Sequence, residues 1–114
     1  MTPREALHTY FGFDDFRPLQ AEIIESVLSG KDTLALMPTG GGKSICFQIP
    51  TLVIGQENQE KRLCLVITPL IALMRDQVAN LRARGIQAEA VYTGMSWDRQ
   101  RMALDNCLYG PYHF

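Results

Sequence analysis

A glycine-rich loop is the part of the sequence whose residue types and spacing most directly suggest chemistry. The loop reads Pro38-Thr39-Gly40-Gly41-Gly42-Lys43-Ser44. Consecutive glycines allow the backbone to approach a ligand closely and to turn several N–H groups toward one anion. In such a loop Lys43 would be the catalytic cation that reaches the β- and γ-phosphates, and Ser44 would ligate Mg²⁺. The loop therefore predicts a site for a nucleoside triphosphate and Mg²⁺.

The elements on either side of this loop must hold it in place. A continuous apolar run at residues 33–37 predicts a strand that is buried on both faces. A helix over about residues 43–48 would point its positive end at the anion, and Pro50 would kink or restart that helix. The alternative is a glycine-rich turn whose Lys43 is merely solvated, but the flanking strand and helix favour a phosphate loop. Met37 departs from the standard motif, which has glycine at that position.

Local patterns predict two helices before the phosphate loop. Thr2 and Glu5 have the spacing of a capping box, with proline at the first helical position, and Gly12 would end this helix. Pro18 would open a second helix, whose apolar residues line one face until Gly30. Both helices would precede the strand that leads into the loop.

Strands and helices are predicted to alternate after the loop as well. Apolar runs predict strands over residues 63–67 and 88–92. Helical spacing of apolar residues predicts a helix that stops at Gly85, and Ser96 would cap a further helix that ends at Gly110. Strands that alternate with helices are typical of an α/β fold, so we expect a parallel sheet flanked by helices.

Composition limits the protein class. A chain of 114 residues has room for one domain, and its 11 Lys and Arg against 12 Asp and Glu mean that any polyanion site must be local. Cys46, Cys64 and Cys107 lie far apart in the sequence, which favours small core residues in a reducing compartment over zinc ligands. No apolar stretch has the length of a signal peptide or a membrane span, so we expect a cytoplasmic protein without membrane contact.

Four stretches resemble motifs of one enzyme family. Residues 37–44 resemble the variant phosphate loop of superfamily 2 helicases, and most closely that of the RecQ family of DNA helicases. Residues 16–20, Phe-Arg-Pro-Leu-Gln, resemble the family's adenine-reading motif, residues 46–50 its post-loop helix, and residues 66–78 its motif Ia. The resemblance implies a RecA-like P-loop NTPase fold that is incomplete in this chain. Residues 1–114 would be the N-terminal part of the first motor domain, with no second domain present.

The same resemblance implies a function and a set of site residues. It implies an ATP-dependent helicase that acts with 3′-to-5′ polarity on single-stranded and forked DNA, in DNA repair and recombination. In a bacterium this enzyme would be associated with the nucleoid. The residues implied for ATP binding are Phe13, Arg17, Gln20, Thr39, Gly40, Gly41, Gly42, Lys43 and Ser44. Those implied for DNA binding are Thr68, Pro69 and Arg75.

The chemistry of the first ATP-binding residues agrees with these roles. The Gln20 amide carries both a donor and an acceptor, so it can pair with the N6 and N7 edge of adenine and select ATP over GTP. Arg17 and Phe13 could stack on the base. Packing of Phe13 under the helix is an equally good interpretation, and Phe16 is expected to pack there.

The residues around motif Ia have suitable partners for a DNA backbone. The Thr68 hydroxyl and the Arg75 guanidinium are groups that commonly bind phosphate. Four further arginines could extend a basic track, or could simply be solvated helix surface: Arg82, Arg84, Arg99 and Arg101.

The sequence lacks one motif that the resemblance would require for hydrolysis. Asp-Glu-x-His, which binds Mg²⁺ and activates water in this family, does not occur in the 114 residues. We therefore expect these residues alone to be inactive, and we expect the strand at residues 33–37, without neighbours, to promote aggregation. Two other interpretations remain open. One is a nucleotide-binding module that never hydrolyses ATP, and the other is a kinase-type or transporter-type P-loop ATPase without a nucleic-acid substrate.

Overall fold

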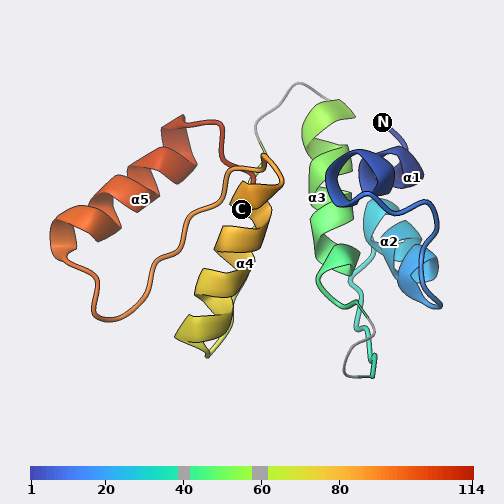
Figure 1. Cartoon of the computed structure of the whole chain (residues 1–114), viewed down its shortest axis with the longest axis horizontal. Helices are drawn as coiled ribbons and strands as arrows, with labels where there is room; N and C mark the ends of the chain where they lie inside the picture. Colours follow the sequence, from blue (N-terminus) through green and yellow to red (C-terminus); the bar gives the residue numbers. More distant parts are fainter. Residues whose placement is uncertain (39–41, 58–61) are drawn as a thin grey trace. The chain divides into compact units, whose positions relative to one another are not determined.

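The computed structural model describes residues 1–38, 42–57 and 62–114 of the chain (Figure 1). Thr39, Gly40 and Gly41, three of the predicted phosphate-binding residues, lie outside the described residues. The chain divides into two compact units, Met1–Glu60 and Lys61–Phe114. Each unit is built around its own helices.

The first unit begins with a short helix that has the predicted cap. Helix α1, Pro3–Ala6, continues directly into a π-helical turn, η1, Leu7–Phe11. The Thr2 hydroxyl accepts a hydrogen bond from the Glu5 backbone, and the Glu5 carboxylate accepts one from the Thr2 N–H. Gly12 ends the segment in the left-handed conformation, with a φ of 74°. The predicted capping box and the predicted helix end at Gly12 are both confirmed. Each depends only on residues a few positions apart, so the sequence suffices to predict it.

The core of the first unit forms where α1 and η1 pack with two longer helices. These helices are α2, Gln20–Leu28, and α3, Ile45–Glu57. In Figure 1, α1 and α2 lie beside α3, and α3 contacts both of them. The buried side chains of this core are Ala6, Leu7, Ile24, Ile49 and Val53. The packed helices hold the start of α2 and the start of α3 in one place.

Helix α3 continues through Pro50, so the predicted restart at this residue is wrong, while the alternative of a kink stays a prediction. Proline has no N–H for the Cys46 carbonyl, and its ring crowds the preceding turn. Two features of the structure compensate. The Pro50 ring is fully buried, and the Thr51 hydroxyl donates a 2.8 Å hydrogen bond to the Phe47 carbonyl in the same turn. Burial in the core therefore keeps helical a segment that the sequence alone would interrupt.

The second unit contains the two later helices, close to where they were predicted. Helix α4, Ile71–Ala83, ends before Gly85, which has a φ of 79°. Helix α5, Trp97–Tyr109, begins with Ser96, whose hydroxyl accepts a hydrogen bond from the Arg99 N–H. The buried apolar residues of this unit are Leu81, Ile86, Ala88, Ala103 and Phe114. The predictions of both helices are confirmed.

The three predicted strands are not formed in the part of the chain that the structure describes. The predicted burial on both faces is also wrong. In the run at residues 33–37, Leu34 is 89% exposed and Leu36 84%, while Leu65 is 81% exposed in the run at residues 63–67. A strand needs neighbours that supply hydrogen bonds along both edges and cover both faces. These runs have apolar sequences, but in the described residues they are not paired and covered in this way.

Isolated backbone hydrogen bonds nevertheless join three segments of the second unit. The Cys64 N–H donates to the His113 carbonyl at 2.8 Å, and the His113 N–H donates to the Gln87 carbonyl at 3.2 Å. The Glu89 N–H donates to the Phe114 carbonyl at 3.1 Å. Residues 113–114 thus lie between the two apolar runs of this unit and bind one run on each side. No strand or bridge is assigned to these contacts among the described residues.

Among the helices that the structure describes, none combines the length and the apolar character needed to cross a membrane.

Candidate nucleotide-binding site

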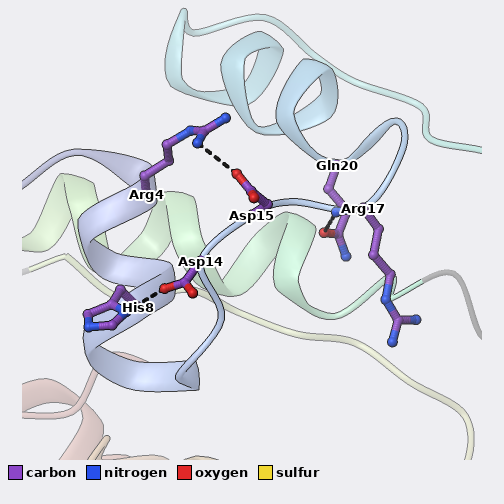
Figure 2. A network of polar contacts seen from close by, with 6 residues as sticks. All are labelled: Arg4, His8, Asp14, Asp15, Arg17 and Gln20. Carbon is purple, nitrogen blue, oxygen red and sulfur yellow. Dashed lines mark hydrogen bonds and ion pairs between the residues drawn. The ribbon is translucent and has the colours of Figure 1, made fainter.

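The side chain of Gln20 connects the predicted adenine-reading segment to the phosphate loop. Gln20 is the first residue of α2 and is only 2% exposed. Its Oε1 accepts a 2.8 Å hydrogen bond from the Arg17 N–H, as Figure 2 shows, and its Nε2 donates a 3.0 Å hydrogen bond to the Gly42 carbonyl. The amide therefore uses one N–H group and its oxygen to hold two backbone segments that are far apart in the sequence.

An unusual backbone conformation directs Gln20 inward. Leu19, the N-cap residue of α2, has a φ of 73° and is the one non-glycine residue with positive φ among those described. For a leucine this left-handed conformation costs about 1–2 kcal/mol. The Leu19 side chain is half-exposed, so burial of leucine does not account for the strain. Strain of this kind is often kept where it positions a functional group, and here it precedes the buried amide directly.

Gly42 is the described glycine of the phosphate loop, and its position requires glycine for two reasons. Its φ is 78°, in the left-handed region. A Cβ atom at this position would collide with Nε2 of Gln20. The backbone of the loop thus comes close to Gln20 in a way that any larger residue would prevent. The close approach has the character expected of a loop shaped around a ligand.

Lys43 and Ser44 lie directly before α3, where the phosphate chemistry was predicted. The Lys43 side chain is exposed, and the carbonyls of Lys43 and Ser44 accept hydrogen bonds from the first N–H groups of the following turn. Lys43 also lines a cavity of about 240 Å³ with Thr33, Met37 and other residues. An ammonium group, a hydroxyl and the positive end of a helix thus come from consecutive positions of the chain, and donors of these kinds fit a phosphate chain with its Mg²⁺.

Cys46 is a packing residue under this loop. The side chain is buried, with Sγ 3.6 Å from the Met37 sulfur and 4.0 Å from the Gly42 carbonyl oxygen. Burial raises the pKa of the Cys46 thiol, and a backbone hydrogen bond opposes part of that rise. The thiol consequently stays protonated and unreactive at neutral pH. The prediction that this cysteine is a small core residue is confirmed.

The phenylalanines of the preceding loop separate into two roles. Phe16 is half-buried and packs against the core of the first unit, as predicted. Phe13 is 50% exposed. Its exposure argues against the packing alternative, and its stacking on a base stays a prediction. The Arg17 side chain extends away from the Gln20 amide in Figure 2, so the backbone of Arg17, rather than its guanidinium, contacts Gln20 there.

An ion pair and a hydrogen bond that sequence reasoning missed tie this loop to the N-terminal helices. Arg4 on α1 contacts Asp15 at 2.8 Å, and His8 on η1 contacts Asp14 at 3.2 Å (Figure 2). All four side chains are largely exposed, so each pair contributes little to stability. Their effect is to limit the positions of the loop between Gly12 and Arg17. No local pattern predicts them, because the partners are 11 and 6 residues apart in a non-helical segment.

The predicted DNA-binding residues lie in the second unit, two of them before α4 and one on it. Thr68 is half-buried, and its hydroxyl accepts a long hydrogen bond of 3.5 Å from the Leu70 N–H. Pro69 is exposed in the same turn. Arg75, on α4, donates a 2.9 Å hydrogen bond to the Tyr92 hydroxyl. Sequence reasoning did not find Tyr92 as a partner of Arg75.

Comparisons with known proteins agree with the motifs. The family model described as "DEAD/DEAH box helicase" matches residues 17–111. The chain is 45% identical over 92 residues, 81% of its length, to the "Probable ATP-dependent DNA helicase RecS" of Bacillus subtilis. It is 41% identical over 109 residues, 96% of its length, to the "ATP-dependent DNA helicase RecQ" of Pasteurella multocida. The protein of the same name from Synechocystis is 42% identical over 100 residues, 88% of this chain.

These matches concern a limited part of each relative. The chain spans 17% of the length of the Bacillus subtilis protein, 16% of the Pasteurella multocida protein and 20% of the Synechocystis protein. The family match covers most of this chain and implies a RecA-like P-loop fold. The chain therefore belongs to the DEAD/DEAH box helicase family, and its relatives place it in the RecQ branch of that family.

Proposed function

We propose that this chain carries the ATP-binding part of an ATP-dependent DNA helicase that unwinds DNA with 3′-to-5′ polarity. The observation that carries this proposal is the hydrogen bond from Gln20 to the Gly42 carbonyl. It brings the predicted adenine-reading residue to the phosphate loop, so one unit could hold both ends of an ATP molecule. The names of the relatives, which are ATP-dependent DNA helicases, support the same reaction class.

Different residues of the first unit would bind the phosphates, the metal ion and the base of ATP. Thr39, Gly40, Gly41 and Gly42 would supply backbone N–H donors to the phosphates, and Ser44 would ligate the metal ion. Lys43 would offset the negative charge that develops on the transferred phosphoryl group. Gln20, Arg17 and Phe13 would hold the adenine base. Bound ATP supplies the free energy of phosphate hydrolysis, which the complete enzyme would couple to strand separation.

The exposed apolar runs support a proposal about the fold. Leu34, Leu36, Leu65 and Ile67 are each more than 80% exposed within their own unit. Large apolar side chains at this density favour burial. We propose that the runs at residues 33–37, 63–67 and 88–92 act as strands of a parallel RecA-like sheet in the natural protein.

Stimulation of ATP hydrolysis by single-stranded DNA tests the proposed function. We expect the complete natural protein carrying this sequence to hydrolyse ATP severalfold faster with an oligothymidylate than without it. It should also unwind a duplex with a 3′ tail, whereas a duplex with only a 5′ tail should stay intact. A P-loop ATPase without a nucleic-acid substrate would show neither effect, and a non-hydrolysing module would release no phosphate under any condition.

Replacing Gln20 by alanine is expected to reduce the preference for ATP over GTP. We expect the ratio of kcat/KM for ATP to kcat/KM for GTP to fall about tenfold, because the side chain that would recognise the edge of the base is lost. The KM for ATP should also rise, since the Gly42 carbonyl loses its bond to the amide. Steady-state assays with the two nucleotides measure both effects.

Gln48 provides a matched control for this substitution. It is a second buried glutamine of the same unit, 5% exposed, and lies on α3. Gln48→Ala should lower the melting temperature without changing the ATP-to-GTP ratio. If the ATP-to-GTP ratio of kcat/KM is unchanged in Gln20→Ala, Gln20 does not recognise the base.

A further inference from the structure

A polar cavity of the second unit lies outside the predicted ATP site. It has a volume of about 410 Å³ and is lined by residues of α4, of the segment around residues 89–95 and of α5. Its charged lining consists of Arg75, Arg82, Arg99 and Glu89. The lining therefore includes three arginines and one carboxylate, which makes the cavity basic in a chain whose net charge is −1.

One of the three arginines of this cavity is paired with its only acidic lining residue. Arg82 and Glu89 form an ion pair at 3.4 Å, and the Asn106 amide donates a 3.3 Å hydrogen bond to the same Glu89 oxygen. Glu89 thus balances the charge of Arg82. Arg75 and Arg99 remain as two positive groups, on helices α4 and α5, without an acidic residue among the other lining residues.

Tyr92 fixes the position of the Arg75 side chain in two ways. The Arg75 guanidinium donates a 2.9 Å hydrogen bond to the Tyr92 hydroxyl, and its Cζ lies 4.9 Å from the centroid of the Tyr92 ring. The hydroxyl accepts one of five N–H donors that a guanidinium carries, so the group keeps capacity to bind an anion. A side chain that is held in place before binding loses less conformational entropy when its ligand arrives.

Arg99 occupies a position that the helix itself does not favour. It lies in the first turn of α5, where the positive end of the helix dipole repels a cation. An anion in the cavity would be attracted by Arg99, by the N-terminus of α5 and by Arg75. Arginine forks match the geometry of phosphate oxygens, whereas a single surface charge provides no such match.

We propose that Arg75 and Arg99 bind one phosphodiester group of a single nucleic-acid strand in this cavity, and that Tyr92 is the positioning residue that presets Arg75. The inference rests on the proposed function and adds to it: it assigns a phosphate contact to Arg99 and an indirect role to Tyr92. Neither residue contributes to the ATP-binding residues of the first unit.

Binding of a fluorescent oligothymidylate to the complete natural protein, measured by anisotropy without nucleotide, tests the positioning role. Tyr92→Phe keeps the ring but removes the hydroxyl, and we expect it to weaken binding about threefold to tenfold. Arg75→Ala should weaken binding at least as much. The double variant should bind no more weakly than Arg75→Ala alone, because the hydroxyl acts only through Arg75. Arg75→Lys keeps the charge but loses the fork, and should also bind more weakly than the natural protein.

The salt dependence of binding tests the contact with Arg99. Arg99→Ala should reduce the slope of log K against log salt concentration by about 0.7, the value for one phosphate contact on a single strand. Arg101→Ala is the matched control, since Arg101 is exposed on the same helix and does not line the cavity. Tyr109→Phe is the corresponding control for Tyr92, because Tyr109 is 85% exposed on α5 and lies outside the cavity lining. Thermal melting of each variant verifies that it is folded.

The possible failures can be told apart. If the natural protein does not bind the oligothymidylate, the proposed function itself is wrong. If it binds but Tyr92→Phe binds equally well, or if the losses from Tyr92→Phe and Arg75→Ala add, then Tyr92 does not act by positioning Arg75. If Arg99→Ala has the same slope as the natural protein, Arg99 makes no phosphate contact in the cavity.

Discussion

Replacement of Lys43 by alanine is expected to abolish ATP hydrolysis while the protein stays folded. Lys43 is exposed in the turn before α3, so its removal should leave the core of the first unit unchanged. Its ammonium would stabilise charge that develops on the phosphates, and loss of one such group lowers kcat by at least about a hundredfold. Phosphate release in the presence of single-stranded DNA measures kcat, and thermal melting measures stability.

Lys31 offers a control with the same change of charge. It is exposed in the segment after α2 and does not line the cavity that contains Lys43. Lys31→Ala should hydrolyse ATP at the natural rate and melt at the natural temperature. Normal turnover in Lys43→Ala would contradict the assignment of residues 38–44 as a phosphate loop.

Replacement of Gly42 by alanine is expected to have the second largest effect, on both ATP affinity and stability. A φ of 78° costs an alanine about 1–2 kcal/mol relative to glycine. The new Cβ would also collide with the Gln20 amide and displace it from the Gly42 carbonyl. Because both segments of the site would shift, we expect ATP to bind roughly tenfold to a hundredfold more weakly. Titration with a fluorescent ATP analogue and unfolding in urea measure the two effects.

Gly30 allows backbone strain to be separated from the collision. Its φ is 83°, close to that of Gly42, but a Cβ at Gly30 would meet nothing within 4 Å. Gly30→Ala should therefore lose a similar amount of stability from strain and keep its ATP affinity. Combining Gly42→Ala with Gln20→Ala should recover part of the stability that the collision removes. Equal ATP affinities for Gly30→Ala and Gly42→Ala would show that the contact with Gln20 has no role in binding.

The helices with local start and stop residues could be predicted from the sequence. Thr2 and Glu5 form their capping box within one turn. The Ser96 hydroxyl caps α5 through the N–H of Arg99, three residues later in the sequence. Gly12 and Gly85 end their segments because glycine adopts positive φ without strain. Each of these interactions depends on residues a few positions apart, so the sequence contains what is needed to predict it.

Elements that depend on distant partners were predicted less well. The apolar composition of residues 33–37 indicates a buried strand, but burial and pairing require neighbours that the sequence of this segment does not specify. Helix α3 shows the opposite case, since packing keeps it continuous where Pro50 alone would interrupt it. The left-handed conformation of Leu19 is likewise imposed from outside, because leucine does not favour it.

The phosphate loop depends both on the types of its residues and on tertiary contacts between distant residues. The sequence by itself determined the types of its residues, from Pro38 to Ser44, and the presence of Gln20 in an adenine-reading motif. Only the tertiary structure decided that the Gln20 amide is buried and bound to Gly42, 22 residues away, and that Tyr92 holds Arg75 from 17 residues away. Side-chain chemistry is a property of the residue, whereas contacts between distant residues form only when helices pack and bring them together.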